Sequence, residues 1–330
     1  MVDITRFEEN EIQALIILGE LYDPIETPNH NSYKFYPKSI AEARTYFRRF
    51  AVDVSDTIVA LMERGHAVRD DNGSRLTEQG LTISRELRRA RPPIWYWYKD
   101  FYTAIEESKV FSEYCKRTFG KDMSQHGFSD LAEIDFMLTV LDLSKESRVL
   151  DVGCGNGNIA EYISDVTEAD VTGIDYIPEA IAQARRRTVS KQSRLHFMVG
   201  NLEQLDLESQ SYDAIISIDS IFFGKDMKKT VVGLKGLLKE GGVMAVFCDE
   251  GFGATLKENG LIYDVYDRSR EHYGHLQLKH RVAQEMKEAF EEEGNGFIAE
   301  NLLTESLDNS VPYDSWTRQI TRYFYHVEGL

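Results

Sequence analysis

The sequence predicts an α/β fold with a mainly parallel sheet, preceded by a second, smaller helical domain. An apolar strand at 147–150 runs into a glycine-rich turn and then at once into a helix at 159–163. The first ninety residues instead show helical spacing and one hairpin signal. After the glycine turn, strand-like segments alternate with helices as in βαβ units. These segments are 170–174, 195–199, 212–218 and 243–247.

The amino-terminal part has the pattern of a separate helical unit. Apolar spacing predicts helices over 8–22 and 55–64, and Ser39 is placed to cap another helix between them. Asn72 and Gly73 then separate two short strand-like segments, which is a strong hairpin signal. A final helix follows the hairpin, so we expect helices around one short hairpin.

The composition fits a protein of the cytoplasm. At 330 residues the chain is long enough for two domains, and its 42% hydrophobic content is ordinary for a soluble protein. No apolar run approaches the ~20 residues that cross a bilayer, and the start lacks a signal-peptide pattern. Cys115, Cys154 and Cys248 are far apart, which favours a reducing compartment and argues against structural zinc. We expect neither a membrane segment nor a bound metal.

The charge distribution disfavours a nucleic-acid partner. The formal net charge is −17, and nearly all of it is carried by residues 92–330. A strongly acidic surface repels phosphate backbones and attracts cationic small molecules. A need for solubility explains the negative charge equally well. The third expected helix carries Asp56 and Glu63, where a DNA-reading helix needs basic or amide side chains. We therefore expect no nucleic-acid partner.

The glycine turn predicts a cofactor site. Gly153, Gly155 and Gly157 recur at every second position, unlike the G-x-G-x-x-G spacing of dinucleotide-binding turns. Asp151 precedes them, and a carboxylate aimed into the turn suits an ammonium group better than a pyrophosphate. The next strand ends in Asp175, where an acid can accept hydrogen bonds from both ribose hydroxyls. S-adenosylmethionine has a ribose, an amino-acid portion and no phosphate, so it fits both acids.

Residues 147 to about 250 resemble a class I S-adenosylmethionine-dependent methyltransferase, with five elements in the order of that family. The resemblance implies a seven-stranded Rossmann-like sheet, and a turn that holds the methionine end of the cofactor. Asn201 stands where the family usually has an Asp beside the adenine, and its carbonyl oxygen can still accept from the adenine amino group. The implied cofactor-binding residues are Asp151, Gly153, Cys154, Gly155, Gly157, Asp175, Tyr176, Asn201, Leu202 and Asp219.

Catalytic residues are expected on three segments. Asp219 follows the fourth strand, where the family places residues near the transferred methyl group. The segment 114–130 resembles a region of bacterial small-molecule methyltransferases, including relatives of the sarcosine and dimethylglycine N-methyltransferases, that closes over the cofactor. His126 is its candidate general base, and a helix-terminating histidine without a catalytic role is an equal alternative. Tyr273 lies in an insertion at about 250–310 that would complete the acceptor pocket.

The chain is expected to have three regions. Residues 1–92 resemble a winged-helix domain, which in small-molecule O-methyltransferases makes dimer contacts and roofs the pocket, so the resemblance implies a homodimer. Residues 93–143 form an aromatic linker and a helical lid, and the aromatic side chains at 94–102 either cage a cation or join the domains. Residues 144–330 form the cofactor-binding catalytic domain.

The implied activity is methyl transfer by in-line displacement from S-adenosylmethionine to a small-molecule amine or hydroxyl, which leaves S-adenosylhomocysteine. Much of the rate enhancement in methyl transfer comes from aligning the acceptor with the methyl group. A general base is needed only when the acceptor atom arrives protonated. Two alternatives stay open: a winged-helix regulator that senses S-adenosylmethionine, and a peptide or protein methyltransferase. The Asn-Pro-Pro-Tyr signature of nucleic-acid base and glutamine methylation is missing after the fourth strand. The residues do not identify the methyl acceptor.

Overall fold

The computed structural model describes residues 6–23, 54–70, 73–91, 93–202, 204–224, 226–316 and 321–329. The chain divides into two compact units, Met1–Asp100 and Phe101–Leu330, and each is described by itself. The division lies inside helix α5 (Pro93–Ile105), whereas the sequence places a boundary at residue 92. The expected helix that begins at Ser39, and Asn72 of the expected hairpin, lie outside the described residues.

The amino-terminal unit contains three described helices and a hairpin before α5. The hairpin pairs two strands antiparallel, with Ala67 opposite Leu76, as the sequence predicts. Helix α1 is buried along most of its length and packs against α3 and α4. The bounds are α1 Glu9–Tyr22, α3 Val54–Glu63, β1 Ala67–Asp70, β2 Gly73–Leu76 and α4 Glu78–Ala90.

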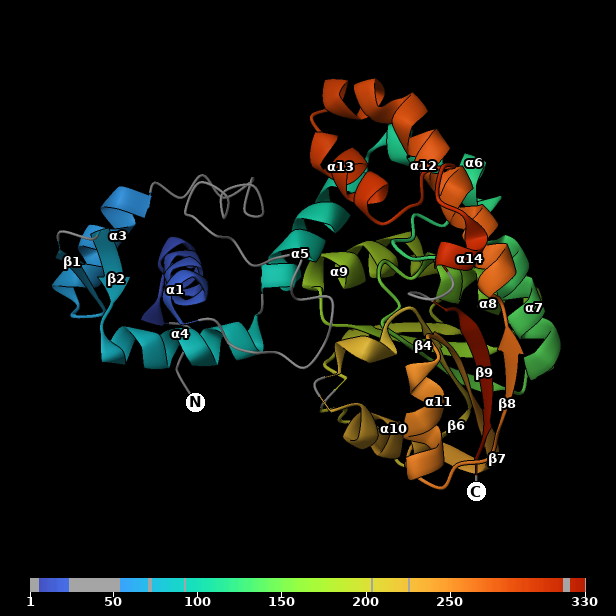
Figure 1. The fold of residues 1–330 in the computed structure, drawn as a ribbon. Helices are drawn as coiled ribbons and strands as arrows, with labels where there is room; N and C mark the ends of the chain where they lie inside the picture. The colour runs from blue at the N-terminus through green and yellow to red at the C-terminus, as the bar shows by residue number, and fades with distance from the viewer. Residues whose placement is uncertain are drawn as a thin grey trace. The chain divides into compact units, whose positions relative to one another are not determined.

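The second unit is built on a seven-stranded sheet with the strand order β5-β4-β3-β6-β7-β9-β8 (Figure 1). This confirms the expected α/β architecture with a Rossmann-like sheet. Strands β3 to β7 run parallel, and β9 is antiparallel to both of its neighbours. The bounds are β3 Arg148–Val152, β4 Asp170–Asp175, β5 Leu195–Val199, β6 Tyr212–Ile218, β7 Leu238–Cys248, β8 Tyr263–Asp267 and β9 Tyr323–Glu328.

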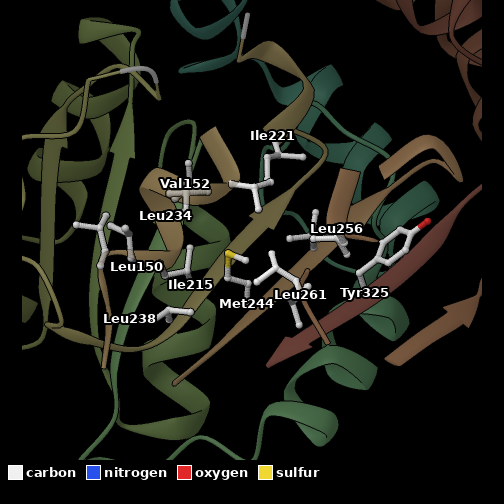
Figure 2. Close-up of a cluster of buried hydrophobic side chains, with 14 of the residues drawn as sticks. Leu150, Val152, Ile215, Ile221, Leu234, Leu238, Met244, Leu256, Leu261 and Tyr325 are labelled. Atoms are coloured by element: carbon white, nitrogen blue, oxygen red, sulfur yellow. The ribbon is translucent and has the colours of Figure 1, made fainter. Parts of the chain in front are cut away.

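Helices α10 (Met227–Lys235) and α11 (Gly251–Glu258) cover one face of the sheet. Figure 2 shows the apolar cluster between them and the sheet. It joins side chains of β3, β6 and β7 to both helices and includes Leu150, Ile215, Leu234, Met244 and Leu256.

Helices α7 (Leu131–Leu141), α8 (Asn158–Thr167) and α9 (Pro178–Arg187) supply the core of the other face. Because the central strands are buried on both faces, their sequences are nearly continuous apolar runs. The cluster on this side includes Ile134, Val149, Ile163, Ala184 and Phe324.

The strand order reverses its direction at β3, which lies between β4 and β6. In open α/β sheets of this kind, ligands bind beyond the carboxyl ends of the strands at such a switch point. The glycine turn follows β3 directly, so the fold places it at the expected binding position.

Two segments differ from the expectation. Residues 238–242, which precede the expected strand 243–247, also belong to β7. The pairing register with β6 shifts between Tyr212 and Ala214, so these extra residues form a bulge. Strand β8 comes from the segment expected as an insertion, and it forms an edge of the main sheet. The rest of that segment is helical: α12 Ser269–Glu292, α13 Gly296–Thr304 and α14 Tyr313–Trp316. Among the described helices, none has both the length and the apolar character needed to cross a membrane.

Candidate functional site

The glycine turn lies at the carboxyl end of β3 and is tied to the end of β4. The backbone N–H groups of Gly153 and Cys154 both donate to the carbonyl oxygen of Ile174, at 2.8 and 3.0 Å. The N–H of Gly155 donates to the Asp175 carboxylate at 2.9 Å. Asp175 therefore braces the turn from the neighbouring strand, in addition to any contact with a ligand.

A pocket opens beside this turn, and three segments line it. The first is the turn itself. The second is the loop 120–130 between α6 (Lys109–Phe119) and α7, which we call the pocket loop. The third part comes from single elements: Tyr102 of α5, Asn158 and Ile159 at the start of α8, and Ile218 at the end of β6. The predicted site residues that the structure brings together in this lining are His126, Asp151, Gly153, Cys154 and Gly155.

Two glycines of the turn leave no room for a side chain. A Cβ atom on Gly155 would lie 2.3 Å from the hydroxyl oxygen of Tyr102, and one on Gly153 would lie 2.4 Å from the Cβ of Ser220. Both residues have positive φ angles, 55° and 75°, which other residues rarely adopt. The turn therefore needs glycine because of its own packing as well as for ligand access.

Two buried carboxylates give the site its charge. Asp151 is 3% exposed and Asp175 is 8% exposed. Burial, together with the nearby Asp175 carboxylate, raises the pKa of Asp151 to about 7. Burial also raises the pKa of Asp175 to about 6, although backbone N–H donors, including that of Gly155, lower it in part. The described lining residues include Asp151 but not Asp175, and no Lys or Arg, so a cationic ligand in the pocket would stabilise the Asp151 carboxylate.

The pocket fits the methionine end of the expected cofactor. The side-chain Oε1 of Gln125 is buried in the pocket lining and has no hydrogen-bond partner among the described residues. With the Asp151 carboxylate it offers two acceptors to an ammonium group. The sequence did not single out Gln125 as a binding residue, and the only signal for it was its place in the segment 114–130.

Other predicted cofactor residues lie outside this lining. Gly157 precedes α8 with a φ of 74°. Tyr176 follows β4 and is partly buried, which raises its pKa. Asn201 follows β5, is exposed, and pairs with Gln204, while Leu202 packs against the core beneath α10. Tyr176, Asn201 and Leu202 follow the ends of β4 and β5, at the positions that the resemblance assigns to the adenosine portion.

Asp219 is held by an ion pair. Its carboxylate accepts from Nη1 of Arg322 at 2.6 Å and from the backbone N–H of Phe128 at 2.8 Å. Arg322 also pairs with Glu133 at 3.0 Å and donates to the Ser129 hydroxyl at 2.6 Å. These contacts tie the Asp219 carboxylate to the pocket loop and to Arg322, and its catalytic and cofactor-binding roles stay predictions. No pattern in the sequence marks Arg322 as part of the site, and it directly precedes β9.

The structure separates the other two candidate catalytic residues. The Tyr273 hydroxyl donates to the Val311 carbonyl at 2.5 Å and its ring contacts Trp316, and its catalytic role stays a prediction. Tyr273 is absent from the described lining. His126 lines the pocket and stands inside the pocket loop, beyond the end of α6, so it does not terminate a helix.

Comparisons with known proteins point to one domain family. Residues 143–302 match a family model described as a methyltransferase domain. The chain is 29% identical over 161 residues to phosphoethanolamine N-methyltransferase 1 of Triticum aestivum, a match that covers 46% of this chain and 31% of that protein. It is 37% identical over 112 residues to malonyl-[acyl-carrier protein] O-methyltransferase of Acetivibrio thermocellus, covering 33% and 38%. The chain thus spans less than half the length of these relatives.

A solved structure shares the fold. It is phosphoethanolamine N-methyltransferase 2 of Haemonchus contortus in complex with phosphomonomethylethanolamine and S-adenosylhomocysteine. The TM-score is 0.53 at 17% identity, and the match covers 70% of this chain and 60% of the other. At this identity the likeness concerns the fold alone.

Proposed function

We propose that this chain, which carries an S-adenosylmethionine-dependent methyltransferase domain over residues 143–302, transfers a methyl group to a small-molecule amine or hydroxyl. The observation that supports this most is the pair of buried acceptors, Asp151 and Gln125, beside the glycine turn. They suit the ammonium group at the methionine end of the cofactor. One named relative is an N-methyltransferase and the other an O-methyltransferase, which supports a nitrogen or an oxygen acceptor without identifying the molecule that carries it.

Each pocket residue then has a distinct role. When bound, S-adenosylmethionine supplies an electrophilic methyl group on a sulfonium sulfur. Asp151 and Gln125 accept hydrogen bonds from its ammonium group, and Asp175 accepts from the ribose hydroxyls while it braces the turn through Gly155. His126 takes a proton from an acceptor that arrives protonated. The remaining catalysis is alignment of the acceptor lone pair for in-line displacement.

An amine is the acceptor that the charges favour. The described pocket lining holds one carboxyl group, that of Asp151, and one imidazole, that of His126. It holds no Lys or Arg. The net charge of −17 adds a field that attracts cations. An acceptor that carries a phosphate would find no cationic partner in this lining, so we place an ammonium substrate first and a neutral hydroxyl second.

The test of this function has two steps. Isothermal titration with S-adenosylmethionine measures binding, and pooled amines and phenols are then screened for release of S-adenosylhomocysteine. We expect binding and turnover in an amine pool. Binding without turnover in any pool would move the function to a macromolecular acceptor or to cofactor sensing. Absence of binding would overturn the assigned cofactor site. It would also overturn the adenine-binding role of Asn201, which is exposed.

We expect the affinity for S-adenosylmethionine to fall in acid. Before binding, burial holds the pKa of Asp151 at about 7 and that of Asp175 at about 6, and a bound cation stabilises their charged forms. Binding therefore releases protons. The dissociation constant should rise as the pH falls below about 7, by up to about tenfold per pH unit for each carboxylate. Titration calorimetry near pH 5.5 and pH 8, in two buffers of different protonation enthalpy, measures both effects.

The matched control for this pH dependence is Asp151→Asn. The amide cannot titrate, so the variant should bind more weakly at pH 8 and lose the part of the pH dependence that lies near pH 7. Equal wild-type affinity at both pH values, with no proton release, would contradict a cation bound beside these carboxylates.

We also infer that the amino-terminal unit is a winged-helix domain that makes homodimer contacts, and that the protein works in the cytoplasm. The order of helices α1 and α3, the β1–β2 hairpin and α4 supports the first inference. Light scattering of the full chain tests it, and a monomer at micromolar concentration would contradict the dimer.

A further inference from the structure

Strand β8 is the last strand of the main sheet, beyond β9, and no described strand pairs with its outer edge (Figure 1). It reads Tyr-Asp-Val-Tyr-Asp over 263–267, and the last four of these residues are exposed. Ile262 just before it is 68% exposed, and Val265 at its centre is 48% exposed. Natural sheets protect such edges with charged side chains, proline or a bulge. β8 has no proline and no shift of register on β9, and its charges are two aspartates.

The hydrogen bonds to β9 show which backbone groups of β8 point outward. The Ile262 carbonyl accepts from the Glu328 N–H at 3.0 Å, and the Arg268 N–H donates to the Arg322 carbonyl at 2.9 Å. Bonded residues alternate along an antiparallel strand, so the even-numbered residues of β8 bond to β9. The outward N–H and C=O groups belong to the odd-numbered residues, which are Tyr263, Val265 and Asp267.

The sequence of β8 is complementary to itself when a second copy runs in the opposite direction. A two-fold axis at Val265 sets the two Val265 residues opposite each other. Tyr263 then faces Asp267 of the other copy, and Asp264 faces Tyr266. No two carboxylates are directly opposed, which is the arrangement that would destabilise a sheet. The same axis brings the outward groups of the odd-numbered residues together, as antiparallel pairing requires. Any other axis leaves part of β8 without an opposite residue of β8.

We propose that β8 is a dimer interface, at which the β8 strands of two copies pair antiparallel about a two-fold axis at Val265. The interface is separate from the contacts inferred for the amino-terminal unit, and it does not rest on the proposed function. Tyr263 packs against the cluster that α11 covers, and Val265 lies on the same face of the sheet, so the two valines meet there. On the other face the Asp264 carboxylates lie diagonally across the axis. Because each copy also carries a net charge of −17, salt should strengthen the dimer.

The outward N–H of Val265 gives a selective test. Val265→Pro removes this donor and spares the bonds to β9, which the neighbouring residues make. Val265→Thr keeps the donor and the branched side chain, so it is the matched control. Contacts of the amino-terminal unit are the same in both variants and do not alter the comparison.

Sedimentation velocity of the full chain over a range of concentrations measures the association. We expect Val265→Pro to raise the dissociation constant of the dimer about tenfold or more, because two hydrogen bonds are lost at the axis. Val265→Thr should stay within about twofold of the wild type. Equal association of Val265→Pro and the wild type would overturn the proposal, and so would a wild type that is monomeric at micromolar concentration.

Charged side chains at residue 265 test the symmetry itself. Val265→Lys and Val265→Glu each set two like charges opposite each other, so each variant alone should dissociate more than the wild type. An equimolar mixture opposes a lysine to a glutamate and should recover the dimer. A mixture as dissociated as its parts would overturn the axis at Val265. Val166→Lys, at a valine of α8 that is 52% exposed, is the matched control and should associate as the wild type does.

Hydrogen exchange of residues 262–268 separates a second copy from any other occupant of the edge. In the wild type, we expect the outward amides to exchange slowly at high protein concentration and quickly after dilution. Exchange that is slow at every concentration would show that another part of the same chain covers β8. Exchange that is fast at every concentration would show an edge without a partner, and either result would overturn the proposal.

Discussion

Replacing Arg322 by Met is expected to lower the free energy of unfolding by about 3–5 kcal/mol, because it removes the close cation of two buried carboxylates and leaves only Arg268, 3.9 Å from one of them. Those carboxylates are Asp219 and Glu133, at 2.6 and 3.0 Å from the guanidinium. Burial already raises the pKa of Glu133, and the arginine is what opposes that rise. Urea denaturation of the full chain measures the change, using the transition that S-adenosylhomocysteine shifts to higher denaturant.

The matched control is Arg186→Met on the exposed face of α9. Arg186 also pairs with a carboxylate, that of Glu106, but its side chain is 60% exposed. Water and salt screen such a pair, so the variant should lose less than about 1 kcal/mol. Equal losses in the two variants would show that the Arg322 contacts do not hold the catalytic unit together.

Replacing Asp175 by Ala is expected to weaken S-adenosylmethionine binding about 10²-fold, or about 3 kcal/mol by the usual conversion. Two losses add in this variant. The ribose hydroxyls lose a charged acceptor, which is worth more than a neutral hydrogen bond. The N–H of Gly155 loses its partner at 2.9 Å, so the glycine turn is no longer braced against β4.

Asp170→Ala is the control for this experiment. Asp170 begins the same strand that Asp175 ends, and its side chain is 40% exposed at the opposite edge of the sheet. Titration calorimetry should give wild-type affinity for Asp170→Ala. Unchanged affinity in Asp175→Ala would remove the ribose assignment, and with it the strongest link between the sequence pattern and the cofactor.

The parts of the candidate pocket that could be predicted from the sequence are local. Asp151, Gly153 and Gly155 lie within one short segment, where strand, turn and helix follow from spacing and from the conformational freedom of glycine. The sheet was predictable because each buried strand is an apolar run between turn residues. Strand β8 was missed because it is an edge strand whose residues are largely exposed, so it lacks such a run.

The parts that were missed depend on contacts between distant residues. Arg322 meets Glu133 across 189 positions, and Glu305 meets His126 from a helix of the insertion. No periodicity or spacing records such pairings. Tyr273 was assigned to the pocket because it lies in the right segment, but its hydroxyl is committed to the Val311 carbonyl. The place of the segment in the chain suggested that it lies near the site, but it does not show which of its side chains face the ligand.

The position of β9 has a consequence for how the protein is made. This strand lies between β7 and β8, although both precede it in the chain. During synthesis β8 therefore cannot join the sheet until β9 has left the ribosome. Arg322 leaves with β9, so the anchor of the pocket loop is among the last contacts available. The nascent chain can complete its glycine turn early, yet a finished binding pocket arises only after nearly all of this sequence has been translated.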